Sequence, residues 1–177
     1  MARFVALFRG INVGRAKRIA MADLRALLES MGFGDVRTLL NSGNAVFSGP
    51  AESHAKLARR IRVAVASRLG VDALVIVKSA KDIDAVVANN KLAAIAKDPS
   101  RLLVAFTHDA KSLAALASIA NADWGAEEVH VGEHAAYVWC ANGILESKAG
   151  VALLTGLGQT GTTRNWSTVV KIHALLR

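Results

Sequence analysis

The order of apolar segments in the first 77 residues constrains the fold more than any other feature of this sequence. Short apolar runs alternate with stretches whose apolar residues recur at helical spacing, in the order β-α-β-β-α-β. This order is typical of the split βαβ unit of ferredoxin-like folds. The predicted strands cover residues 3–9, 36–40, 44–48 and 73–77, and the predicted helices cover residues 22–31 and 53–69.

Local signals support these elements. Leu24, Leu27, Leu28 and Met31 recur at the spacing of a helix that buries one face. The tripeptide NSG between the second and third strands favours a hairpin turn, and Ser53 is a suitable N-cap for the second helix. The N-terminal half is therefore predicted to be ferredoxin-like.

The second half repeats the pattern less regularly. A strand is predicted at 102–107, a helix at 110–120, a hairpin over 127–140 that turns at Gly132-Glu133, and helices at 146–155 and 164–176. The final helix stands where a last strand would complete the unit. The fold class is thus α+β with two ferredoxin-like (β-α-β-β-α-β-type) halves, the second ending in an extra helix.

The domain boundaries follow from the same pattern. We expect an N-terminal half over 1–78, a linking helix and turn over 79–100, and a related C-terminal half over 101–177. The turn is predicted from AKDPSR at 96–101. A chain of 177 residues also fits one compact domain, so that alternative stays open.

Composition limits the class of partner. The chain carries 22 Lys and Arg against 14 Asp and Glu, a net charge of +8, and residues 1–20 contain no acid. Such clusters attract polyanions, although a basic solvated surface without a partner is an equally good interpretation. Cys140 is the only cysteine, and no segment approaches the about 18 apolar residues that span a bilayer. We expect a cytoplasmic protein with no membrane partner, whose oligomeric state stays open.

Three stretches resemble a known family. They are LFRGINVG at 7–14, NSGNAVF at 41–47 and TTRNWSTVVK at 162–171, and together with Met21 and Gly32-Phe33 they span nearly the whole chain. The chain is similar to domain-of-unknown-function family 1697, an uncharacterised bacterial family. The resemblance implies an α+β fold with ferredoxin-like elements and implies no activity. The sequence departs from the family pattern at Arg15, usually glycine, and at Ala20, usually proline.

Gly156, Gly158 and Gly161 have the spacing G-x-G-x-x-G of a dinucleotide-binding loop. That loop must follow a strand, begin a helix and be followed by an acidic residue about 20 positions later. Here the preceding segment is predicted to be helical, and no Asp or Glu follows Gly161. We therefore predict no nucleotide cofactor, and no other cofactor is indicated.

Two loops remain as candidates for anion binding. The loop after Gly161 leads into the predicted helix 164–176, whose N-terminus would expose unpaired N–H groups beside Thr163, Arg164 and Asn165. The alternative is a purely structural role, in which Thr162 or Thr163 caps this helix and Arg164 pairs with a carboxylate. The loop GINVGRAKRI after the first strand is long and cationic, and its glycines and Asn12 could equally well only shape a turn.

The remaining motifs give weaker evidence of a functional site. His130-Val-Gly-Glu133-His134 matches the H-x-x-E-H spelling of inverted zinc proteases, but it lies across a predicted hairpin rather than on a helix. No metal site is therefore predicted, and Cys140 at the end of an apolar strand is expected to be a buried thiol. No catalytic residue is indicated.

Three classes of function stay open. The first is a protein that binds an anionic ligand, either a phosphate-bearing small molecule or a nucleic acid. The second is an enzyme on a small anionic substrate, and the third is a structural or oligomer-forming protein without a ligand. The candidate ligand-binding residues are Arg9, Gly10, Asn12, Arg15, Lys17, Ser42, Asn44, Thr163, Arg164 and Asn165.

Overall fold

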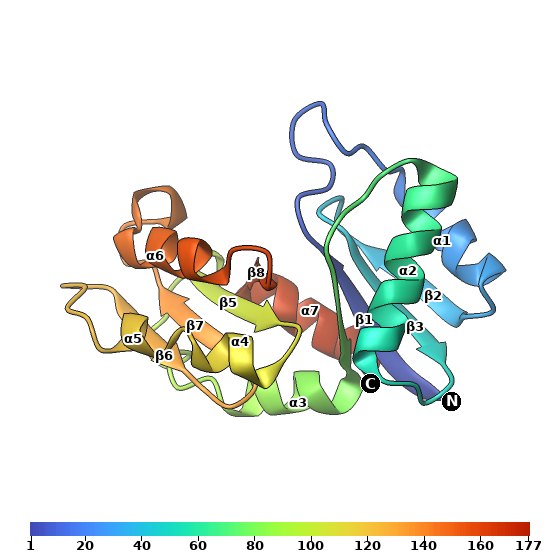
Figure 1. The fold of residues 1–177 in the computed structure, drawn as a ribbon. Coiled ribbons are helices and arrows are strands. Elements are labelled where there is room, and N and C mark those ends of the chain that lie inside the picture. Colours follow the sequence, from blue (N-terminus) through green and yellow to red (C-terminus); the bar gives the residue numbers. More distant parts are fainter. The chain divides into compact units, whose positions relative to one another are not determined.

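A computed structural model describes residues 1–177 and divides the chain into two units (Figure 1). Unit 1 comprises Met1–Lys81 and Ala174–Arg177, and unit 2 comprises Asp82–His173. The C-terminal residues are attached to unit 1 by the first strand, where the Arg3 guanidinium donates to the carbonyls of Leu175 at 2.8 Å and Arg177 at 3.1 Å. Whether the units act as separate domains stays a prediction.

Unit 1 has the predicted order of elements. They are β1 (Ala2–Phe8), α1 (Met21–Ser30), β2 (Gly34–Leu39), β3 (Asn44–Gly49), α2 (His54–Leu69) and β4 (Val75–Ser79). The strands form an antiparallel sheet in the order β2-β3-β1-β4, which is the ferredoxin-like arrangement. β4 begins and ends two residues later than predicted, because its pairing with β1 starts at Val75 and continues through the polar residues Lys78 and Ser79.

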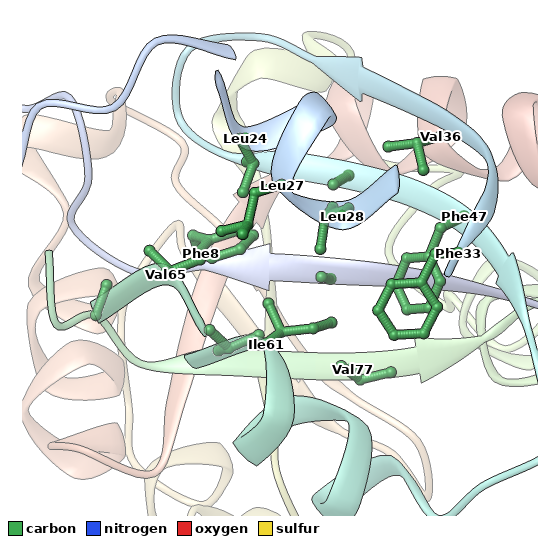
Figure 2. Close-up of a cluster of buried hydrophobic side chains, with 14 of the residues drawn as sticks. Phe8, Leu24, Leu27, Leu28, Phe33, Val36, Phe47, Ile61, Val65 and Val77 are labelled. Carbon is green, nitrogen blue, oxygen red and sulfur yellow. The ribbon is translucent and has the colours of Figure 1, made fainter. Parts of the chain in front are cut away.

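The core of unit 1 lies between one face of this sheet and helices α1 and α2 (Figure 2). Phe8 and Phe47 project from the sheet, while Leu24 and Leu28 reach it from α1 and Ile61 reaches it from α2. The Ser53 hydroxyl accepts the backbone N–H of Lys56 at 3.3 Å, which confirms the predicted N-cap of α2.

Unit 2 contains a second sheet with the same topology. α3 (Ala80–Ala88) and a 3-10 turn (Pro99–Arg101) precede it, and its strands are β5 (Leu102–Thr107), β6 (Glu128–Val131), β7 (Ala136–Trp139) and β8 (Gly161–Asn165). Their order is β6-β7-β5-β8, antiparallel throughout. The remaining helical segments are α4 (Ala110–Ala114), α5 (Ala117–Ala120), a 3-10 turn (Ile144–Glu146), α6 (Lys148–Leu157) and α7 (Trp166–Leu176). Two ferredoxin-like halves and a C-terminal helix are thus confirmed.

The last strand of unit 2 corrects the sequence interpretation. Residues 161–165 form β8, paired with β5, rather than the beginning of a helix. Thr162 and Thr163 are β-branched and fit the pleated surface of a strand. A side chain at Gly161 would place its Cβ 2.3 Å from the Phe106 carbonyl oxygen, so this close pairing requires glycine. The second half therefore completes its βαββαβ unit before the extra helix.

The predicted helix 110–120 is also two helices. The Asp109 carboxylate caps the first by accepting the Ser112 N–H at 2.7 Å. The chain then changes to i→i−3 hydrogen bonds, from Leu116 to Leu113 and from Ile119 to Leu116, both at 3.0 Å. This tighter winding separates α4 from α5.

Candidate functional site

A long loop, residues 9–20, connects β1 to α1 and projects beyond the end of the unit 1 sheet (Figure 1, dark blue). Gly10, Asn12, Gly14 and Lys17 have positive φ, between 51° and 68°. The Asn12 N–H donates to the Lys17 carbonyl at 3.0 Å, which closes the loop on itself. Asparagine and glycine adopt this conformation at low cost, whereas lysine does not.

The side chain of Asn12 holds the loop in place. Its Oδ1 accepts the Ile19 N–H at 2.8 Å, and its Nδ2 donates to the carbonyls of Ile19 and Asn41, both at 2.8 Å. Both amide hydrogens are therefore used inside the protein. Asn12 joins the two ends of its own loop and ties them to the β2–β3 turn.

The β2–β3 turn is built around the SGN motif. Asn44 is fully buried, and its Nδ2 donates to the Leu39 carbonyl at 2.8 Å and to the Ser42 hydroxyl at 3.3 Å. The Phe8 N–H donates to the Gly43 carbonyl at 2.9 Å. Segments 7–14 and 41–47 therefore lie in contact, and the side chains of Asn44 and Ser42 stabilise the turn.

A pocket of about 350 Å³ lies where these segments meet α1. Ala20 precedes α1 without forming a side-chain cap, so no side chain accepts from the first-turn N–H groups, of which that of Asp23 donates to the Ala20 carbonyl at 3.0 Å. Arg18 is exposed and donates to the Gly14 carbonyl at 3.1 Å, which leaves most of its donors for other partners. The lining residues are Asn12, Arg18, Ile19, Ala20 and Asn41.

Of these lining residues, only Asn12 was among the candidates from sequence. Arg15 and Lys17 lie on the same exposed loop, and Arg9 is half-buried at its start. Arg18 was noted only as one of the cations of the loop, and Asn41 was missed. The signal for Asn41 was its place beside the SGN motif, and the signal for Arg18 was its position three residues before the first helix.

Residues 9–20 contain no acid that could balance the positive charge of this loop, whereas three of the five cations of α2 have acidic partners. On α2, Lys56 and Arg60 pair with Glu52 at 3.0 and 2.6 Å. Arg62 holds Asp72 with two contacts of 2.6 and 3.0 Å. This hydrogen bond keeps the pKa of Asp72 below its usual value, with a smaller contribution from the charge of Lys17.

The remaining candidates lie in unit 2, and the structure gives them different roles. Arg164 lies in β8, nine-tenths buried, and its guanidinium donates to the Thr163 carbonyl at 2.8 Å and to the Thr162 hydroxyl at 3.0 Å. Burial lowers its pKa to about 10. The predicted helix start at residue 164 is therefore corrected, because Thr163, Arg164 and Asn165 end strand β8 and helix α7 begins at Trp166; anion binding by these three residues stays a prediction.

The cap of the last helix is Asn165, not Thr162 or Thr163. Its Oδ1 accepts the Thr168 N–H at 3.0 Å and the Thr168 hydroxyl at 2.9 Å. The glycine-rich stretch ends α6 at Gly158 and leads into β8. A helix-to-strand connection is the reverse of the strand-to-helix connection of a dinucleotide-binding loop.

His130 and Cys140 of unit 2 have packing roles. His130 stacks on Tyr137 with ring centroids 5.8 Å apart, and burial lowers its pKa. Cys140 is fully buried, as predicted, and burial raises the pKa of its thiol. No group of three His, Cys, Asp or Glu side chains is placed to hold a metal ion.

Comparison with known proteins identifies the family. Residues 1–137 match the family model described as "Protein of unknown function (DUF1697)". The chain belongs to this DUF1697 family. The match covers all of the β1–α1 loop, the SGN turn and the pocket between them, so the pocket is part of the DUF1697 region of the chain.

One solved structure supports the fold of this DUF1697 protein. The chain is similar to the structure of conserved bacterial protein SP0830 from Streptococcus pneumoniae, with a TM-score of 0.82, 24% identity and 99% of each chain covered. At this identity the likeness concerns the fold. No curated protein matches the chain. None of the helices combines the length and the apolar character that crossing a membrane requires.

Proposed function

We propose that this DUF1697 protein binds a phosphate-bearing ligand in the pocket between the β1–α1 loop and the β2–β3 turn. Arg18 is the ligand's main charged partner, and Arg15 and Lys17 add positive potential around it. A pocket of about 350 Å³ is within the size range of small-molecule sites.

The observation that carries this proposal is the unbalanced charge of the loop. Arg15 and Arg18 form no ion pair, and Asp72, the carboxylate whose pKa the charge of Lys17 helps to lower, is already held by Arg62. Cations without protein partners raise the local concentration of anions and bind them with charge-assisted hydrogen bonds. The first turn of α1, which no side chain caps, adds N–H groups of the same electrostatic sign, partly offset by the carboxylate of Asp23 in that turn.

Asn12 and Asn44 have a supporting role in this proposal. Their amide groups form hydrogen bonds within the protein, and these bonds fix the walls of the pocket. The lining residues include no carboxylate, imidazole or thiol. We therefore propose binding, and assign no acid–base chemistry to this pocket.

The test is a calorimetric titration of the full chain with inorganic pyrophosphate at low ionic strength. Arg18→Gln is expected to weaken binding about 10- to 100-fold, because hydrogen bonds to charged groups contribute about 1.5–3 kcal/mol. Arg59→Gln is the matched control, since Arg59 is an exposed arginine of α2 and its loss removes the same charge. Equal weakening by both variants would indicate general attraction to a basic protein and contradict the proposal.

The salt dependence of the affinity distinguishes a nucleic acid from a small phosphate compound. A nucleic acid would show a steep linear fall of log affinity with log salt, with a slope near the number of neutralised phosphates. A small phosphate compound would show a shallow dependence. If an oligonucleotide contacts Arg15, Lys17 and Arg18 together, we expect the replacement of any of these residues by glutamine to lower the slope of log affinity against log salt.

A further inference from the structure

Exposed apolar side chains gather in unit 2 on the turn before α6 and on that helix (Figure 1). Leu145 is 96% exposed, Val151 is 60% exposed and Leu154 is 41% exposed. Leu145 and Val151 line the same surface hollow of about 300 Å³, and Glu146 and Lys148 line it as well. Val151 and Leu154 are three residues apart on α6, so they share one face of the helix. We call these five residues the α6 patch.

The turn holds Leu145 in its exposed position. The Glu127 carboxylate accepts the backbone N–H of Lys148 at 3.1 Å, and the Ser147 hydroxyl donates to the same carboxylate. Ser147 is also the N-cap of α6. Leu145 is therefore presented to solvent by a turn that hydrogen bonds define. Contiguous exposed apolar residues with polar neighbours are typical of interaction surfaces.

The charges of the α6 patch are balanced, unlike those of the whole chain. Glu146 and Lys148 are both exposed, and neither forms an ion pair within the chain. Unit 2 carries 7 Lys and Arg against 9 Asp and Glu, whereas unit 1 carries 15 against 5. Two copies of this basic protein therefore repel each other least at a contact made through unit 2. A nucleic acid or an acidic membrane gains little from a patch without excess positive charge.

We propose that the α6 patch joins two copies of this chain in a dimer with two-fold symmetry. In such a contact each patch meets its own copy, so a residue that contacts a second residue is contacted by that second residue in return. A two-fold axis near the centre of the patch places Glu146 of one protomer opposite Lys148 of its partner, and this ion pair forms twice. One acid and one base around an apolar centre make the patch complementary to itself.

The shape of the surface supports the same arrangement. Leu145 projects into solvent, and it lies between two hollows in the sense that it belongs to the lining of both. The second hollow has a volume of about 480 Å³ and also includes Glu146 in its lining. Each protomer thus offers a projecting leucine and space beside it for the leucine of the other protomer.

The expected dimer is weak. Stable complexes bury about 800 Å² per partner, and a patch of five residues supplies less. We therefore expect a dissociation constant on the order of 10–100 µM. Exposed ion pairs contribute little affinity, so Leu145 supplies most of it, whereas the charges determine which surfaces match.

The first experiment is sedimentation equilibrium of the full chain between about 10 µM and about 1 mM, a range that brackets the expected constant. Leu145→Ser is expected to weaken dimerisation about tenfold or more, because both protomers lose the side chain. Val63→Ser is the control, since Val63 is an α2 valine exposed to 60% and lies outside the patch. It should leave the dissociation constant unchanged.

The second experiment reverses the charges. Glu146→Lys and Lys148→Glu each place like charges opposite one another across the two-fold axis, and each is expected to weaken dimerisation about tenfold. An equimolar mixture of the two variants is expected to form a heterodimer, because the lysines of one variant then face the glutamates of the other. This recovery is specific to a contact between copies of the same patch.

Folding does not obscure these tests. Leu145, Glu146 and Lys148 are exposed, and the side chains of the two charged residues form no hydrogen bond within the chain, so the far-ultraviolet circular dichroism should not change. A wild-type protein that stays monomeric over the whole concentration range overturns the proposal. A dimer that Leu145→Ser leaves intact, or a mixture of charge variants that stays monomeric, overturns it as well. None of these outcomes depends on phosphate binding in unit 1.

Discussion

Gly43 lies at the contact between the SGN turn and the β1–α1 loop, and Gly43→Ala probes that contact. Its φ is +91°, and an added Cβ would lie 2.5 Å from Ile11 Cδ1 and 2.9 Å from Phe8 Cβ. The end of the Ile11 side chain could turn away only within a core where it is 1% exposed. Phe8 Cβ is fixed to the backbone of β1 and cannot move without shifting the strand.

The expected destabilisation has two parts. The left-handed conformation costs alanine roughly 1–2 kcal/mol, and overpacking a well-filled core costs about 1–3 kcal/mol more. Gly43→Ala should therefore lower the free energy of unfolding of unit 1 by about 2–5 kcal/mol. Gly70→Ala is the matched control, because Gly70 has a φ of +70° and no atom within 4 Å of its added Cβ.

The assay is urea denaturation followed by far-ultraviolet circular dichroism. The three tryptophans, Trp124, Trp139 and Trp166, all lie in unit 2, so tryptophan fluorescence follows that unit separately. The difference between the two alanine variants, about 1–3 kcal/mol, measures the close approach alone. Equal destabilisation by Gly43→Ala and Gly70→Ala would refute the reasoning, since only the backbone conformation would then matter.

Three further predictions concern single side chains. Asn12→Ala removes three hydrogen bonds and should open the loop, which increases trypsin cleavage within residues 15–18 relative to the wild type. Asn165→Ala removes the cap of α7 and should lower the free energy of unfolding by about 1 kcal/mol in a urea melt followed by tryptophan fluorescence. Tyr137, the only tyrosine, donates to the Val86 carbonyl at 2.7 Å, and burial raises its pKa to about 12. Because the folded state retains this proton to a higher pH than the unfolded state, the free energy of unfolding should fall as the pH rises from about 10 to about 12. The absorbance of tyrosinate in the folded protein should rise with a midpoint near pH 12. A midpoint near pH 10 in the folded protein would contradict the burial of Tyr137.

Much of the fold could be predicted from the sequence because its apolar pattern is regular. The leucines of α1 and the Ser53 cap of α2 are local signals, and both elements lie within one or two residues of their predicted bounds. β8 was missed because its sequence, GTTRN, has only five residues and no apolar alternation. Its pairing with β5 is a long-range contact, which a local pattern does not contain.

The candidate site was predicted less completely than the fold. The sequence indicated the loop and the SGN turn, but the role of Asn12 depends on hydrogen bonds to residues 7 and 29 positions away. Asn41 contributes its backbone carbonyl, which is independent of residue type.

The central claim, that the pocket of unit 1 binds a phosphate group, is tested most directly by a phosphate titration followed in ¹H–¹⁵N NMR spectra. The claim predicts saturable shifts concentrated in the amide signals of the pocket and in the side-chain signal of Arg18, and their loss in Arg18→Gln. Shifts that grow linearly without saturation, or that spread equally over the basic residues of α2, would contradict it. The amide signals to follow are those of Asn12, Arg18, Ile19, Ala20 and Asn41.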